Sequence, residues 1–217
     1  MKMNQHENQS AFSPRVFCIG RNYVGHVSEL KSAIPEKPVV FIKPASCLVP
    51  PGRAIRFPGH GQDLQHEVEV VIRIGKAGKA MSCEEAFSMI DGVTLGLDLT
   101  LRDVQTGLKQ KGLPWEMAKA FDQSAPIGEF LPYNGSLDLT GIQFCCMVNG
   151  SVRQRGITGD MIFSIDKLIV ELSAVWLLRP GDMIYTGTPS GVGPLRAGDR
   201  IVIESDQLGY FAWNVIA

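Results

Sequence analysis

The stretch LQHEVEVVIRIG, residues 64–75, decides the fold class, because apolar side chains recur in it at every second position. Alternation with a period of two is typical of a β-strand, whose successive side chains point to opposite faces of a sheet. Glu67 and Glu69 therefore project from the same face of the predicted strand. Like charges at this spacing repel each other. The sequence therefore raises the question of why one strand carries both carboxylates.

Extended segments of this kind recur along the chain and are separated by glycine and proline. Asn149-Gly150 lies between two of them and predicts a hairpin, because both residues tolerate the positive φ of a type I′ turn. Such a chain is typical of one β-rich α+β domain, predicted here over residues 15–217 after a loose polar arm over residues 1–14. Predicted strands cover residues 16–20, 39–43 and 93–99, and residues 67–75 of the opening stretch.

Helical patterns are fewer than strand patterns. The segment 82–90 begins with a capping box formed by Ser82 and Glu85. The segment 100–112 is predicted as a helix that Thr100 caps. A short helical turn and a longer helix with an apolar stripe are predicted for residues 22–31 and 164–178.

The composition argues against several classes of protein. The net charge of −1 and the pI of about 6.4 disfavour a nucleic-acid partner, which usually meets a basic face. No apolar run approaches the roughly 20 residues of a membrane span, and the N-terminus lacks the apolar core of a signal peptide. The five cysteines show no C-x-x-C spacing, so we expect buried, free thiols in a cytoplasmic protein.

Two interpretations fit the paired glutamates Glu67 and Glu69. They lie on a solvated strand face, or they bind a divalent cation, which takes oxygen ligands and neutralises their repulsion. Asp98, at the end of the predicted strand 93–99, offers a third carboxylate. It equally suits a helix N-terminus, where acidic side chains are favoured. The local pattern leaves these alternatives open.

Three more segments carry groups suited to catalysis, each with an ordinary alternative. His26 and Glu29 share a face of a helical turn, as a histidine base and its orienting carboxylate would, although this spacing is common by chance. Lys119 lies between apolar neighbours and suits either a fixed charge beside an oxyanion or a surface lysine. The loop with Gly187 and Thr188 offers donors to a carboxylate but also reads as a tight turn.

Seven motifs occur in order between about residues 15 and 205: RNYxxHxxE, PxxFxKP, HExExxxxIG, DxTxRDxQ, GLPWxxAKxFD, MIFSI and TGTPxGVGP. Together they resemble the fumarylacetoacetate hydrolase superfamily, and most closely its small single-domain branch. That branch contains acylpyruvate hydrolases and oxaloacetate decarboxylases or tautomerases. The resemblance implies a mixed β-sandwich roll of the C-terminal-domain type, a homodimer, and a small 2-oxo acid as substrate.

The resemblance also implies roles for individual residues. Glu67, Glu69 and Asp98 match the ligands of Mg²⁺, with Mn²⁺ as the alternative ion. His26 and Glu29 match a water-activating dyad on a mobile lid segment. Lys119 matches a further catalytic residue. The substrate contacts are matched by Arg21, Arg102, Gln105, Gly187 and Thr188.

The activity implied first is hydrolysis of a C–C bond in acylpyruvates such as fumarylpyruvate or acetylpyruvate, by way of a metal-bound pyruvate enolate. An oxaloacetate decarboxylase or an oxaloacetate keto–enol tautomerase or isomerase would use the same enolate. A non-catalytic metalloprotein that binds a keto acid is a third alternative. The sequence separates these activities poorly, because all of them require the same metal ligands.

Overall fold

The computed structural model describes residues 13–217, so the predicted arm over residues 1–14 lies outside this range except for its last two residues. A six-stranded mixed sheet has the strand order β10-β7-β6-β13-β1-β2. Only β1 and β13 pair in parallel within it. Its strands are β10 (Leu131–Pro132), β7 (Ile90–Leu97), β6 (Val68–Ile74), β13 (Met183–Tyr185), β1 (Arg15–Gly20) and β2 (Val39–Pro44).

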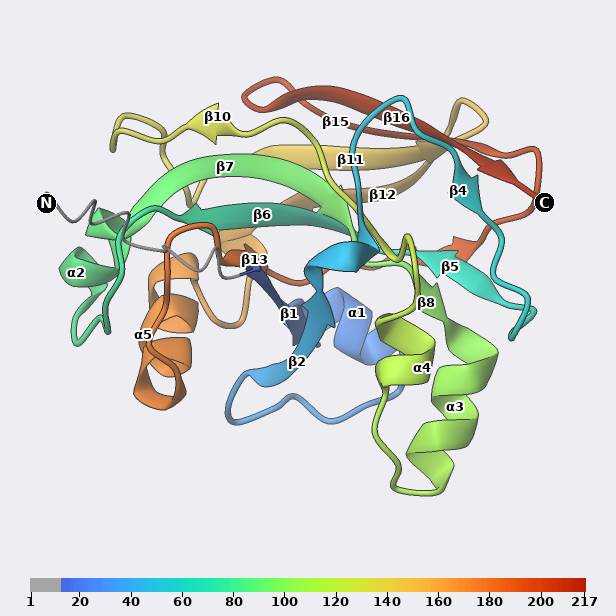
Figure 1. Cartoon of the computed structure of the whole chain (residues 1–217), viewed down its shortest axis with the longest axis horizontal. Helices are drawn as coiled ribbons and strands as arrows, with labels where there is room; N and C mark the ends of the chain where they lie inside the picture. The colour runs from blue at the N-terminus through green and yellow to red at the C-terminus, as the bar shows by residue number, and fades with distance from the viewer. Residues whose placement is uncertain (1–12) are drawn as a thin grey trace, which may run out of the picture.

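A five-stranded sheet lies above the six-stranded one in Figure 1 and has the order β12-β11-β15-β16-β4. One hydrophobic cluster spans both sheets and joins Val70 and Leu95 to Phe144 and Trp213. The predicted β-rich α+β class is therefore confirmed. The remaining strands are β12 (Ser151–Ile157), β11 (Gln143–Val148), β15 (Arg200–Ser205), β16 (Gly209–Ile216), β4 (Ile55–Arg56), β14 (Gly193–Pro194), β5 (Leu64–His66), β8 (Thr100–Leu101), β3 (Leu48–Val49) and β9 (Ala125–Pro126).

The helices form two groups at opposite ends of the six-stranded sheet (Figure 1). At one end α2 (Cys83–Ser88) packs on α5 (Ile165–Val175), whose apolar stripe is buried as predicted. At the other end lie α3 (Arg102–Gln110) and α4 (Glu116–Lys119), with α1 (Val24–Glu29) nearby. The helices at this second end carry the predicted site residues His26, Glu29, Arg102, Gln105 and Lys119. Two short 3₁₀ turns cover Ala45–Cys47 and Thr158–Asp160.

The predicted continuous strand 64–75 is wrong, because the chain changes sheets at Glu67. β5 pairs with β14 and β8 in a three-stranded sheet, whereas β6 pairs with β7 and β13. The adjacent strand, β7, also ends at such a break, and Asp98 lies between β7 and β8. The Asp98 N–H donates to the Glu67 carbonyl at 2.8 Å. Glu67 and Asp98 therefore lie side by side at a paired break in two strands.

The predicted start of the helix 100–112 is also wrong. Thr100 belongs to β8, and its hydroxyl donates to the Asp98 carbonyl at 3.2 Å instead of capping a helix. The helix begins at Arg102 and ends before Gly112, whose φ of 64° continues no helix. Pairing of β8 with β5 overrides the local capping signal.

Several local predictions are confirmed. Ser82 Oγ accepts a bond from Glu85 N at 3.2 Å, and the Glu85 carboxylate accepts from Met81 N rather than Ser82 N. Asn149 and Gly150 have φ values of 51° and 76° between β11 and β12, as a type I′ hairpin requires. All five cysteines are free, and all are buried except Cys83, whose exposure contradicts the expectation of buried thiols.

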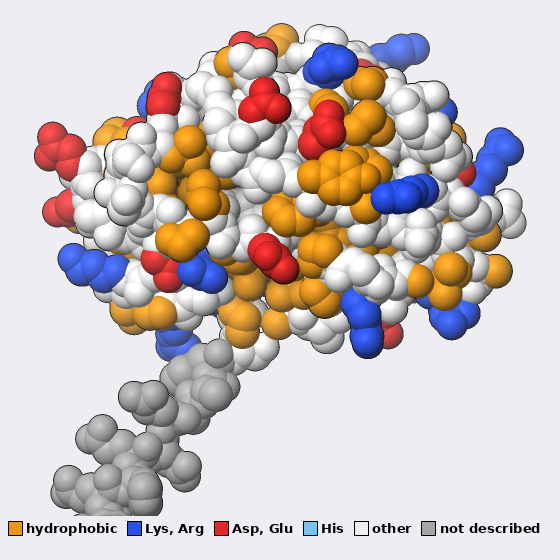
Figure 2. All heavy atoms as spheres, turned by 90° about the horizontal axis from the view of Figure 1, so that it is seen from above, with side chains coloured by type: hydrophobic (Ala, Val, Ile, Leu, Met, Phe, Trp, Pro, Cys, Tyr) orange, Lys and Arg blue, Asp and Glu red, His pale blue; other side chains and the backbone are white. Residues whose placement is uncertain are grey.

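Within residues 13–217 no helix has the length and apolar character needed to cross a membrane. Figure 2 shows hydrophobic side chains exposed among scattered acidic and basic ones on the face seen from above. Large exposed hydrophobic residues of β16 are Tyr210 and Ile216. The homodimer and the cytoplasmic location stay predictions.

Candidate active site

Three carboxylates meet where β6 and β7 leave the six-stranded sheet. Glu67, Glu69 and Asp98 are each less than 5% exposed, and one oxygen from each lies within 4.8 Å of the others. Glu69 stands on β6 opposite Gly96, and a side chain at Gly96 would collide with the Tyr185 ring. The alternation in the sequence predicted that the two glutamates share a side, and their carboxylates do meet although Glu67 lies just before β6; the pairing of β6 with β7 brings the aspartate to them.

Three cationic side chains surround this triad. Lys119 Nζ donates to Glu67 Oε2 at 2.8 Å and to Asp98 Oδ2 at 2.7 Å. Arg102 pairs with the other oxygen of Glu67. Lys119 is buried among charges, so neither a surface position nor an apolar setting describes it.

Lys43 is the third cation, and sequence reasoning missed it. It lies on β2, is fully buried, and places Nζ 2.7 Å from Asp98 Oδ1 while donating to the carbonyls of Ser124 and Leu99. The motif PxxFxKP contains this lysine. Its carboxylate partner is remote in the sequence, so the motif by itself gave no role. A lysine inside an otherwise apolar strand was the available signal.

The surrounding charges shift the pKa values of Glu67 and Glu69 in opposite directions. Burial raises the pKa of Glu67, but the charges of Lys119 and Arg102 outweigh burial and hold that pKa well below its usual range. Burial raises the pKa of Glu69, and the negative charges of Asp98 and Glu67 raise it further. Among the described residues no cationic side chain pairs with Glu69; the Gly187 N–H donates to it at 2.7 Å. A bound cation would therefore stabilise the ionised form of Glu69.

The triad fits a hard divalent cation. Asp98 Oδ1 is buried, and the Lys43 ammonium 2.7 Å away pairs with it by charge but without hydrogen-bond geometry. An oxygen-only donor set on three carboxylates is typical of Mg²⁺ or Mn²⁺ sites. Glu67, Glu69 and Asp98 would hold such an ion, and the ion would relieve the repulsion that raises the pKa of Glu69.

His26 and Glu29 form a hydrogen-bonded pair on α1. His26 Nδ1 lies 3.2 Å from Glu29 Oε2, and the Gly191 N–H also donates to the Glu29 carboxylate at 3.1 Å. An ionised carboxylate only accepts hydrogen bonds, so Nδ1 carries the ring proton and Nε2 is left as the basic nitrogen. His26 lines the same pocket as Glu67 and Glu69.

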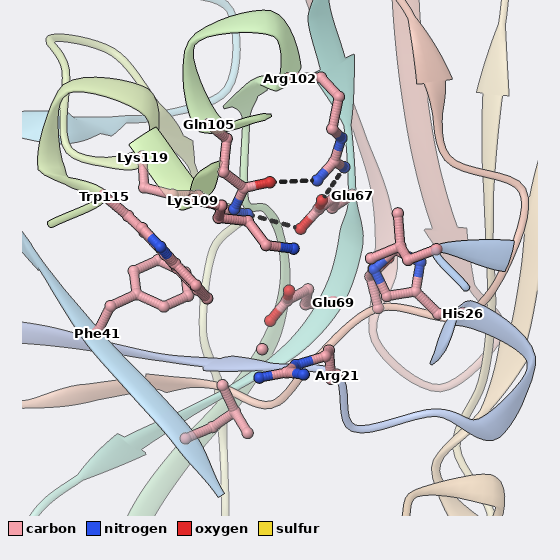
Figure 3. A pocket seen from close by; sticks show the side chains of 14 residues that line it. Arg21, His26, Phe41, Glu67, Glu69, Arg102, Gln105, Lys109, Trp115 and Lys119 are labelled. Carbon is pink, nitrogen blue, oxygen red and sulfur yellow. Dashed lines mark hydrogen bonds and ion pairs between the residues drawn. The ribbon is translucent and has the colours of Figure 1, made fainter. Parts of the chain in front are cut away.

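The pocket is open, and the empty space among its lining residues and at its mouth amounts to about 430 Å³. Figure 3 shows the side chains that line it. Of the predicted substrate contacts, Arg21, Arg102, Gln105 and Thr188 line it. Gly187 does not line it and lies behind Glu69. Arg102 is oriented by Gln105 and Gln65, whose side-chain oxygens accept from it at 2.7 and 2.9 Å. Lining residues that the sequence did not predict are Ile19, Gly20, Leu30, Phe41, Lys109 and Trp115.

The hydroxyl of Thr188 is already engaged within the protein. It donates to the Val68 carbonyl at 2.8 Å and accepts from Gln154 Nε2 at 2.8 Å. Gln154 Oε1 in turn accepts from Val68 N at 3.1 Å. Gln154 belongs to β12 in the other sheet, and its side chain links the Thr188 loop to β6 by hydrogen bonds. No local sequence pattern predicted this role.

This fold and site define a metal-dependent enzyme with a buried acidic triad. The family model for the fumarylacetoacetate (FAA) hydrolase C-terminal domain matches residues 15–216, and the chain belongs to this family. A mitochondrial oxaloacetate tautomerase of Homo sapiens is 42% identical over 186 residues, which cover 86% of this chain and 84% of the relative. An oxaloacetate tautomerase of Escherichia coli is 42% identical over 195 residues, 88% of each chain.

The solved structures give the same family. A fumarylpyruvate hydrolase from Pseudomonas aeruginosa, in complex with Mn²⁺ and pyruvate, superposes with a TM-score of 0.89 at 36% identity. The match covers 94% of this chain and 90% of that one. The fold expected from the sequence motifs is thereby confirmed.

Substituting Lys43→Met is expected to lower the free energy of unfolding in EDTA by about 3 kcal/mol, because Asp98 would lose a buried countercharge. Urea unfolding followed by circular dichroism measures this loss. Lys37→Met, at an exposed lysine before the same strand, is the matched control and should change stability by less than about 0.5 kcal/mol. Equal midpoints for the two variants would contradict the assigned role of Lys43.

Proposed function

We propose that the chain is a Mg²⁺- or Mn²⁺-dependent oxaloacetate keto–enol tautomerase. The observation that carries this proposal is the position of a base and a buried cation in one pocket with two of the triad carboxylates. His26 and Lys119 both line the pocket that contains Glu67 and Glu69. Tautomerisation requires removal of a proton from one atom and stabilisation of negative charge on another, and these two side chains supply both.

The residues divide the reaction as follows. His26 Nε2 removes a proton from C3 of oxaloacetate, and the electron pair of the broken C–H bond moves toward the 2-keto oxygen. The Lys119 ammonium, held by Glu67 and Asp98, presents positive charge to that oxygen. The ion, when bound, supplies a Lewis acid that favours charge on the keto oxygen. His26 then returns the proton to this oxygen, which gives the enol.

Hydrolysis of acylpyruvates, the activity implied first by the sequence motifs, is the second candidate. The similar structure of a fumarylpyruvate hydrolase favours it. In this reaction His26 removes a proton from water, and the hydroxide attacks the distal carbonyl. The C–C bond breaks, its electron pair passes to the pyruvate fragment, and His26 returns the proton taken from water to C3 of that fragment.

A protein that only binds a keto acid is a weaker interpretation. Binding requires the cations and the ion, but it does not require a basic nitrogen that a carboxylate orients. The His26–Glu29 hydrogen bond of 3.2 Å therefore favours an enzyme over a sensor.

A panel of four substrates tests the proposal: the keto and enol forms of oxaloacetate, acetylpyruvate and fumarylpyruvate, each with Mg²⁺, with Mn²⁺ and with EDTA. We expect fast interconversion of the oxaloacetate forms with either ion, followed by the ultraviolet absorbance of the enol, and loss of the catalysed rate in EDTA. An undiminished rate after removal of metal would refute the metal-dependent mechanism. Cleavage of fumarylpyruvate without tautomerisation would favour the second candidate.

A further inference from the structure

Two cationic side chains at the pocket mouth form no ion pair with any acidic residue in 13–217. Lys109 lies near the end of α3 and Arg21 directly follows β1, and both line the pocket that holds Glu69. Figure 3 shows both side chains extending into this space. Arg102 on the same helix is paired with Glu67. Within the described part of the chain no such ion pair joins Lys109 or Arg21, so the pocket's uncompensated positive charge lies at its mouth.

The direction of Lys109 follows from the helix. Arg102, Gln105 and Lys109 are spaced at i, i+3 and i+7, which places them on one face of α3. That face is the pocket wall, because all three line the pocket. The Lys109 ammonium lies 5.9 Å from the centre of the Trp115 ring, an aromatic contact that holds the lysine over the opening.

The cations at the mouth crowd one another. Partial burial lowers the pKa of Lys109, and the charges of Arg21 and Arg102 lower it further. A group of like charges is stabilised by an anion placed between them. Glu67 and Asp98 are already paired with Arg102, Lys119 and Lys43, and no described carboxylate pairs with Lys109 or Arg21, so we expect a bound ligand to supply that anion.

Arg21 adopts a backbone conformation that is unfavourable for a long side chain. Its φ of 61° lies in the left-handed region, which costs free energy for residues other than glycine. The adjacent Asn22 enforces this turn: its side chain donates to Thr186 O at 2.7 Å and accepts from Phe163 N at 2.7 Å. Strain that tertiary contacts maintain is typical of functional positions.

We propose that Lys109 and Arg21 form a second anion subsite, which binds the distal carboxylate of a dianionic 2-oxo acid. This inference rests on the proposed function and names its substrate class. The acidic triad and its ion receive the 2-oxo acid end, and the rings of Phe41 and Trp115, 6.0 Å apart, form an apolar wall for the carbon chain. Oxaloacetate and fumarylpyruvate carry the second carboxylate, whereas acetylpyruvate lacks it.

Matched substrate pairs test the subsite: fumarylpyruvate against acetylpyruvate, and oxaloacetate against its 4-methyl ester. The wild type should prefer each dianion in kcat/KM. Lys109→Met should lower this preference roughly 10- to 100-fold, the factor expected for one hydrogen bond to a charged group. Arg21→Asn should lower it similarly, and asparagine tolerates the left-handed conformation. Lys111→Met, at an exposed lysine just after α3, is the control and should leave the preference unchanged.

A binding measurement separates failure of the subsite from failure of the proposed function. Calorimetry with Mn²⁺ would compare 2-oxoglutarate with 2-oxopentanoate, which has the same chain length but lacks the terminal carboxylate. Selective loss of 2-oxoglutarate affinity in the Lys109 and Arg21 variants would support the subsite. Equal losses for both ligands would overturn it while leaving the metal site intact. A wild type that binds and converts none of these acids would overturn the proposed function as well.

Discussion

Replacing Glu69→Gln is expected to abolish turnover, by at least about a thousandfold, while leaving the metal-free protein at least as stable as the wild type. Glutamine keeps the shape of Glu69 and can still accept from the Gly187 N–H, but it removes one of three clustered negative charges. The ion loses a charged ligand, and the repulsion from Asp98 and Glu67 disappears. A catalytic loss without a loss of stability identifies a binding charge rather than a structural one.

The raised pKa of Glu69 also predicts how the stability of the metal-free protein changes with pH. The pKa of Glu69 is raised in the folded state, so the folded, metal-free protein holds this proton more tightly than the unfolded chain does. Wild-type stability in EDTA should therefore fall as the pH rises from the usual glutamate pKa, about 4.3, toward the raised value. The Glu69→Gln variant should not show this part of the decline, and its advantage over the wild type should grow with pH.

Thermal melts with and without Mn²⁺ provide the second measurement. An ion at a hundred times its dissociation constant stabilises a folded protein by about 2.7 kcal/mol, so the wild-type melting temperature should rise with Mn²⁺. Asp98→Ala and Glu69→Gln should show no such rise. Glu171→Gln, at an exposed position of α5, is the control that should retain it. A Mn²⁺ response that survives in both triad variants would place the ion elsewhere.

Replacing His26→Ala is expected to lower the rate of oxaloacetate tautomerisation and of acylpyruvate cleavage by roughly 10²- to 10⁴-fold, the range for loss of a general base. Decarboxylation of oxaloacetate should suffer far less, because loss of CO₂ requires no proton removal by His26. Mn²⁺ binding should persist, since His26 is not among the triad ligands. Steady-state kinetics on the three reactions measure these differences.

Two further variants test whether the loss in His26→Ala comes from the base itself. Glu29→Gln should produce an intermediate loss, because it weakens the 3.2 Å contact that orients the His26 ring without removing the base. His60→Ala changes an exposed histidine that bonds the Met117 carbonyl, and it should leave the rates near wild type. Equal losses on all three reactions in His26→Ala would exclude proton transfer as its role.

Much of the site could be predicted because its motifs are local. The alternation predicted that Glu67 and Glu69 share a side, and their carboxylates do meet in one cluster, although Glu67 lies just before β6; the His26–Glu29 pair follows from the helical repeat. The motif resemblance indicated Asp98 and Lys119, which the structure brings to the same cluster. Lys43 and Gln154 were missed because each acts on a strand far away in the sequence.

By itself, the sequence determined strands such as β1 and β2, the hairpin at Asn149-Gly150 and the Ser82 cap, since each depends on residues a few positions apart. Only the tertiary structure decided that the strand breaks at Glu67, that Thr100 joins a sheet instead of capping a helix, and which cation compensates each carboxylate. The physical reason is the sequence separation of the interacting groups. Backbone preference acts between chain neighbours, whereas the balance of a buried charge depends on groups that strand pairing brings within about 3 Å.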